Sequence, residues 1–166
     1  TSAVGVRSGS GNAPTLNVAD ANAIAELDGV DTVAPVHWGS VQMVYGPNNW
    51  NAWVQGTTPA YLDARSWPIA DGASFTDSDV RAATRVALIG RTVAQNLFGD
   101  ENPVNKTFRI GQAPFTVLGV LAPKGQNLEG RDQDDLVVMP LTTAQRRVFG
   151  TPFPGSVRQI LVKATP

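Results

Sequence analysis

The stretch VYGPNNWNAWVQGTTPAY, residues 44–61, contains two of the four tryptophans and both tyrosines of the chain. Gly, Pro and two Asn residues at 46–49 separate two runs rich in β-branched and aromatic residues, a pattern typical of a β-hairpin. Because side chains alternate along a strand, the returning strand has two different faces. One face has Trp50, Ala52 and Val54, and the other has Asn51, Trp53 and Gln55.

Outward from this hairpin, short helical and extended patterns alternate. Apolar spacing and turn residues predict helices over 18–27, at 59–64, after an N-cap at Thr76, over 91–98 and from 141, with Asn17 and Thr142 as further caps. Strands are predicted for the extended runs, which are 30–45, 50–56, 84–90, 105–111, 113–123, 136–140 and 156–166. Without a clean βαβαβ series, this order predicts an α+β fold rather than a doubly wound sheet. The similar outer segments favour a discontinuous domain that carries an insertion.

Composition excludes several classes of function. The 166 residues have a formal net charge of −1 and no Lys/Arg-rich run, so we expect no nucleic-acid partner. No cysteine is present, which excludes disulfides and thiolate ligands. Neither a phosphate-binding GxxxxGKS or GxGxxG loop nor a GxSxG nucleophile motif occurs. The single histidine, His37, lies in an extended run, where a structural role is expected, and a zinc site lacks ligands.

The acids of EGRDQDD, residues 129–135, are the remaining cluster. Glu129, Asp132, Asp134 and Asp135 could in principle bind calcium or serve a hydrolase, but the calcium-loop pattern and a partner base are missing. We therefore expect a solvated loop in which Asp135 anchors the following strand. No catalytic, cofactor-binding or metal-binding residue is predicted, and no cofactor.

No apolar run reaches the ~20 residues that cross a bilayer. The chain begins without Met on TSAVGVRSGSGNAP, which we expect to be a flexible lead-in to an excised domain.

Four segments together resemble the periplasmic core domain of MacB-type ABC transporter permeases: YGPNNWNAWVQGTTPAYL, FTDSDVRAATRVALIGRTVAQNLFGDENPVNKTFRIG, FTVLGVLAPKG and DQDDLVVMPLTTAQRRVFG. The order and spacing of these pieces carry the resemblance, which covers about 16–164. It implies a domain between the first two transmembrane helices of an inner-membrane permease whose ATPase is separate. It also implies a porter-like subdomain over 1–57 and 136–166 and an inserted sabre-like subdomain over 58–135.

The same resemblance implies a non-catalytic part of a homodimeric transporter that drives export of macrolides, peptides or lipid-linked cargo. A periplasmic adaptor and an outer-membrane channel are the further partners that it implies. A soluble extracytoplasmic ligand-binding or sensor domain is the alternative, with an aromatic pocket built from the hairpin and His37–Trp38. Cut free, the domain is expected to be monomeric.

The candidate partner or cargo contacts are Tyr45, Asn49, Trp53 and Gln55. Trp50 and Tyr45 are expected to pack structurally, since hairpin aromatics commonly pair or fill a core. Trp53, on the polar face, is the strongest contact candidate.

Overall fold

The computed structural model describes residues 18–27, 29–150 and 159–164. The predicted lead-in and the Asn17 cap lie outside these residues. The helices are α1 Val18–Ala25, α2 Ala60–Ala64, α3 Asp77–Ala82, α4 Arg91–Phe98 and α5 Leu141–Thr143, which continues as a π-helix, η1, over Ala144–Phe149. The strands are β1 Val30–Tyr45, β2 Asn48–Thr57, β3 Ile69–Gly72, β4 Val86–Ile89, β5 Thr107–Ile110, β6 Ala113–Leu121, β7 Leu136–Pro140 and β8 Gln159–Ala164.

Six of these strands close into a ring, in the order β1-β2-β7-β4-β6-β5 and back to β1. The β2–β7 and β4–β6 pairs are parallel and the others are antiparallel. Strand β3 pairs with β6 beside the ring. The α+β prediction is confirmed. The predicted division into 1–57 with 136–166 and 58–135 stays a prediction, and hydrogen bonds between β7 and β4 connect its two parts.

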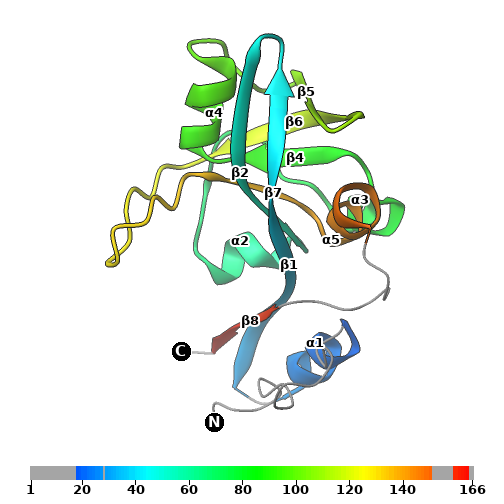
Figure 1. The fold of residues 1–166 in the computed structure, drawn as a ribbon. Helices are drawn as coiled ribbons and strands as arrows, with labels where there is room; N and C mark the ends of the chain where they lie inside the picture. Colours follow the sequence, from blue (N-terminus) through cyan, green and yellow to red (C-terminus); the bar gives the residue numbers. More distant parts are fainter. Residues whose placement is uncertain (1–17, 28, 151–158, 165–166) are drawn as a thin grey trace.

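Strand β1 takes part in two layers of the molecule. Its first half pairs with β8, through Val36 opposite Gln159, and its second half pairs with β2 from His37 opposite Gly56 onward. Figure 1 shows β1 running from the end that holds β8 and α1 up to the tip of the hairpin with β2.

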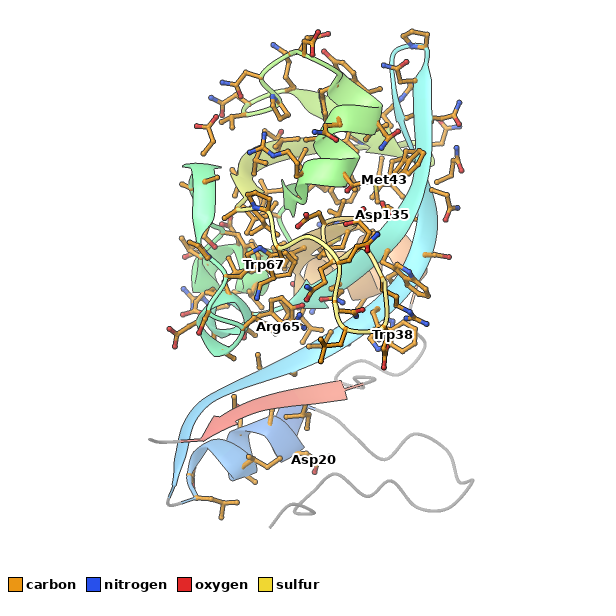
Figure 2. All side chains as sticks on the ribbon, turned by 90° about the vertical axis from the view of Figure 1, so that its left-hand side faces the viewer. Asp20, Trp38, Met43, Arg65, Trp67 and Asp135 are labelled. Carbon is orange, nitrogen blue, oxygen red and sulfur yellow. The ribbon has the colours of Figure 1, made fainter. Side chains whose placement is uncertain are left out.

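Alternation along the strands produces two cores. Odd-numbered β7 residues Val137 and Met139 point into the ring, where they meet β2, β6 and helix α4, and we call this the interior core. Even-numbered Leu136 and Val138 point outward against α2 and Trp67, in what we call the outer core. Because both faces of β4 and β7 are covered, these strands are apolar throughout, as their sequences VALI and LVVMP show. Figure 2 shows Met43 of β1 and Trp67 in these two separate layers.

The hairpin forms as predicted, with a shorter turn. Tyr45 pairs directly with Asn48, so only Gly46 and Pro47 form the turn and both asparagines belong to β2. Gly46 has φ +56°, a conformation that the first central position of a tight hairpin turn requires and that glycine adopts without strain.

Two predicted helix caps have different outcomes. Thr76 forms the predicted capping box with Asp79 at the start of α3. Thr142 is not a cap, because the helix begins at Leu141 and the Thr142 hydroxyl donates to the carbonyl of Val80 instead. Thr143 donates likewise to the Thr84 carbonyl (2.6 Å), so the start of α5 satisfies backbone oxygens left at the end of α3.

Candidate functional site: an aromatic pocket on the β1–β2 hairpin

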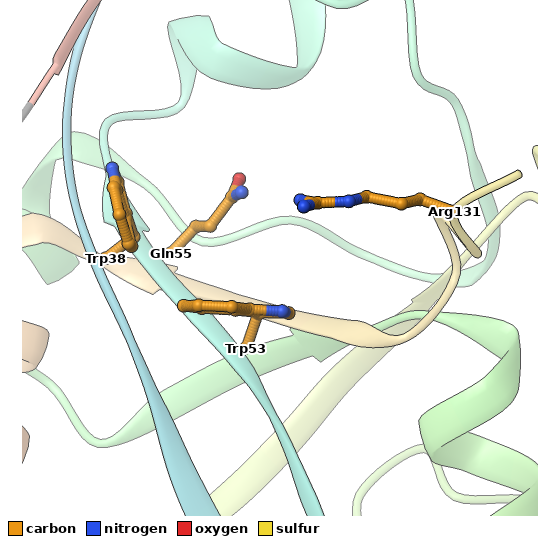
Figure 3. Close-up of a pocket in the computed structure, with 4 residues that line it drawn as sticks. All are labelled: Trp38, Trp53, Gln55 and Arg131. Carbon is orange, nitrogen blue, oxygen red and sulfur yellow. The ribbon is translucent and has the colours of Figure 1, made fainter. Parts of the chain in front are cut away.

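A pocket of about 270 Å³ opens on the outer face of the hairpin, and Trp38, Trp53, Gln55 and Arg131 line it. The strand register brings three of these residues together. Trp38 of β1 lies directly opposite Gln55 of β2, and Trp53 stands two residues earlier on the same face of β2. Figure 3 shows the two indoles forming one side of the pocket, with Arg131 reaching toward Gln55 above Trp53.

The two indole rings meet edge to face. Their centroids lie 5.5 Å apart at an interplanar angle of 72°, a favourable aromatic geometry that holds both rings in place. Trp53 nevertheless remains 46% exposed. Trp38 is partly buried and packs against the outer core. The pair therefore presents a rigid apolar surface to solvent at the edge of a packed core.

Gln55 has a fixed orientation. The Tyr61 hydroxyl, on α2, donates to the Gln55 side-chain oxygen. The Gln55 amide nitrogen is then left with its two hydrogens as donors on the pocket side. Burial raises the pKa of the Tyr61 phenol, although the nearby Arg65 opposes this shift, so the phenol keeps its proton at neutral pH.

Arg131 comes from the segment 122–135 that joins β6 to β7, which we call the arm. Buried Asp134 holds the base of the arm, because its carboxylate accepts from the backbone N–H of Lys124 (2.8 Å) and of Gly125 (3.0 Å). Asp132 accepts from the Thr92 hydroxyl at 2.6 Å. The arm is thus fixed at its base and delivers Arg131 to the hairpin.

The arm's last acid, Asp135, accepts a hydrogen bond from the Trp50 indole nitrogen at 2.7 Å. Asp135 is therefore an anchor for the strand that follows, as predicted, and its partner is on β2. Trp50 is partly buried against the interior core, in agreement with its expected structural role.

Tyr45 and Asn49 lie elsewhere, near the tip of the hairpin. The Tyr45 ring packs on Phe98 with centroids 4.3 Å apart, and its hydroxyl donates to Glu101 at 3.0 Å. That hydrogen bond, together with desolvation and the Glu101 charge, raises the pKa of Tyr45. The Asn49 side-chain oxygen accepts from Gln42 at 2.8 Å.

The structure therefore brings together two of the four sequence-predicted contacts, Trp53 and Gln55, and leaves Tyr45 and Asn49 outside the pocket. The contact role of all four stays a prediction. Sequence reasoning named Trp38 only in an alternative pocket and saw Arg131 only as part of an acidic cluster. Counting back from a two-residue turn would have paired Trp38 with Gln55, whereas the position of Arg131 follows from the fold alone.

His37 is buried, and its ring centroid lies 5.4 Å from that of Phe149, which fits the structural role expected for it. In the described part of the chain, no group of three His, Asp or Glu residues could hold a metal ion. Within 18–27, 29–150 and 159–164, no helix is long and apolar enough to cross a membrane.

Two solved structures illustrate the fold that this chain shares. The periplasmic region of MacB from Actinobacillus actinomycetemcomitans matches with a TM-score of 0.78 at 23% identity, over 92% of this chain and 66% of that one. The extracellular domain of the noncanonic ABC-type transporter YknZ from Gram-positive bacteria matches with a TM-score of 0.75 at 24% identity, over 91% and 74%. The chain thus has the fold of these two protein regions.

Sequence comparison gives the family. The macrolide export ATP-binding/permease protein MacB of Syntrophobacter fumaroxidans is 42% identical over 149 residues, which are 89% of this chain and 21% of that protein. The pyoverdine export ATP-binding/permease protein PvdT of Pseudomonas aeruginosa is 40% identical over 132 residues, 80% of this chain and 20% of that protein. The model of the MacB-like periplasmic core domain matches residues 1–166.

The chain belongs to the MacB-like periplasmic core domain family, and the resemblance drawn from its sequence is confirmed. It is the periplasmic domain of a MacB-type ABC permease, and it spans about a fifth of the length of these curated relatives.

Proposed function

We propose that this domain is a non-catalytic coupling element that links ATP-driven conformational change in the rest of a permease to export of periplasmic cargo. The observation that carries the proposal is the match to relatives named as export ATP-binding/permease proteins. In this proposal the partners are the transmembrane helices and the ATPase domain, a second copy of the permease, a periplasmic adaptor and an outer-membrane channel. The cargo is a macrolide, a peptide or a lipid-linked molecule.

Strand β1 is the element that we propose to transmit motion. It is a single strand of 16 residues, hydrogen-bonded to β8 at one end and to β2 and β5 at the other. A strand rises about 3.3 Å per residue, so one continuous element spans roughly 50 Å. A displacement at the β8 end would reach the hairpin tip without passing through a loop.

The candidate contacts fall into two places along this path. The pocket residues Trp53 and Gln55 are the proposed cargo contacts. Tyr45 and Asn49, near the exposed turn at Gly46, are the proposed contacts to an adaptor, because the turn lies at the end of the molecule opposite α1 and β8 (Figure 1).

A test of coupling is to insert two glycines between Val36 and His37 in the full-length permease. The insertion falls where β1 passes from β8 to β2, and two residues preserve which face every side chain occupies. The control is the same insertion after Gly111, in the β5–β6 turn. The readouts are erythromycin accumulation in a host without its own macrolide exporters, basal ATPase activity and thermal unfolding.

We expect the β1 insertion to abolish the permease-dependent fall in accumulation while ATPase activity and folding persist, and the control to retain export. Unchanged export by a folded β1 variant would overturn the transmission role. A wild-type permease that never lowers erythromycin accumulation would exclude this macrolide as its cargo.

A further inference from the structure

We infer that the pocket lined by Trp38, Trp53, Gln55 and Arg131 binds a small organic anion, a carboxylate carried on a planar apolar ring. The inference rests on the proposal that Trp53 and Gln55 form a contact site, and it adds the chemistry of what they contact.

The polar groups of the pocket are donors. The Arg131 guanidinium has five N–H donors and no acceptor, and the Trp53 indole has only its N–H. The Gln55 oxygen already accepts from Tyr61, which leaves the amide N–H groups for a ligand. A ligand that satisfies this lining must bring acceptors, and a carboxylate pairs bidentately with the fork of a guanidinium and is planar like the rings beside it.

The charge of Arg131 has no ion-pair partner in the described part of the chain. Among the residues that the structure describes, no carboxylate lies within ion-pair distance of Arg131, although four acids lie within four positions of it in the sequence. Three of these acids have other hydrogen-bond donors. Asp132 accepts from Thr92, Asp134 accepts from the backbone at the base of the arm, and Asp135 accepts from Trp50. Three of the four acids are thus engaged elsewhere, and the guanidinium of Arg131 stays available.

Two further cations pack on the rings of Tyr61 and Trp67. The Arg65 guanidinium carbon is 5.8 Å from the centroid of the Tyr61 ring, whose hydroxyl holds Gln55, and 5.7 Å from that of Trp67. The Lys124 ammonium is 5.2 Å from the same Trp67 ring. Arg131 is therefore the one cation among the described residues that line the pocket, while Arg65 and Lys124 share the Trp67 ring.

The apolar half of the ligand follows from the indoles. An edge-to-face pair with one half-exposed ring offers a flat surface on which a planar ring stacks. The volume of about 270 Å³ is at or just below the lower limit of drug-sized sites, which run from ~300 to 1,000 Å³. One or two fused rings fit, and a large macrocycle would touch the pocket only at its edge.

The test uses an isosteric pair of probes, 2-naphthoate and its neutral amide, 2-naphthamide. Binding to the 166-residue chain is followed by NMR of the four tryptophan indole N–H signals, which single substitutions assign. Naphthoate should shift the Trp38 and Trp53 signals, leave those of Trp50 and Trp67 in place, and bind about tenfold or more tightly than the amide. Arg131→Gln should abolish this preference, since a charged hydrogen bond is lost. Arg109→Gln, an exposed arginine on β5, is the matched control.

Any other outcome of this binding experiment refutes one part of the inference. Equal binding of both probes with shifts at Trp38 and Trp53 would refute the anion preference and keep the contact site. Shifts only at Trp50 or Trp67, or no shift with either probe, would refute the pocket as a small-ligand site. Neither result bears on coupling, which the β1 insertion decides separately.

Discussion

Substituting alanine for Trp50 or for Trp53 should separate a structural tryptophan from a contact tryptophan three residues away. The Trp50 ring packs against the interior core and its N–H donates to Asp135 at 2.7 Å. Replacing a core aromatic with alanine costs about 3–5 kcal/mol, and a hydrogen bond to a charged group is part of the loss here. Trp53 is 46% exposed, and its indole nitrogen donates to no carboxylate of the described residues. Burying about half of such a side chain stabilises by about 1–1.5 kcal/mol.

For a chain of 166 residues, each kcal/mol shifts the melting temperature by about 2–4 °C. Trp50→Ala should therefore lower it by about 6–20 °C and Trp53→Ala by about 2–6 °C. Thermal unfolding followed by far-ultraviolet circular dichroism measures both, and urea unfolding checks that the two variants keep the same m-value. Trp50→Phe, which keeps one six-membered ring but not the donor, removes the bond to Asp135 with a smaller loss of packing than Trp50→Ala.

Equal losses in the two alanine variants would refute this reasoning. Trp53 would then be a packing residue and would leave the set of candidate contacts. In the full-length permease, the contact reading adds a second requirement: Trp53→Ala should weaken export by more than its small loss of stability explains.

Three further predictions concern the supports of the site. Asp134→Ala leaves two backbone N–H groups at the base of the arm without their acceptor and should lower the urea unfolding free energy by about 2–4 kcal/mol; a loss below 1 kcal/mol would contradict this role. Thr76→Ala should cost about 1 kcal/mol by the same assay, and Thr76→Ser should restore most of it. Burial raises the pKa of Tyr61, so the folded state holds this proton more tightly. The contribution of Tyr61 to stability should be constant below about pH 10 and be lost above it, so stability should fall less steeply there in Tyr61→Phe. Identical slopes would count against that assignment.

The alternation of the hairpin was predictable from sequence because a strand has a period of two. Trp50 and Trp53 differ by an odd number, so they must face opposite sides whatever the rest of the chain does. The capping box at Thr76 was predictable for a similar reason, since all its partners lie within one helical turn.

Long-range pairing was not predictable in this way. Strand β3, of sequence IADG, is short and mostly exposed, and its sequence has no pattern typical of a strand. It is identified as a strand by its pairing with β6. Closure of the ring depends on the parallel β2–β7 pair, which no local pattern specifies. Arg131 reaches the hairpin because the arm is held in place: Asp134 closes its base locally, and Asp132 accepts from Thr92, which lies 40 positions away in the sequence. No local pattern specifies this second bond.

The pairing of β1 with β8 has a mechanical consequence. The two strands are antiparallel, so Val30 lies beside Ala164 at one end of the ladder and Val36 beside Gln159 at the other. Antiparallel hydrogen bonds run perpendicular to the strands. A force that separates Val30 from Ala164 sideways therefore loads these bonds one after another, as in a zipper, instead of all at once. The closed ring beyond His37 carries little of that load until the zipper has opened, so the ladder is the yielding part and the ring is the stiff part.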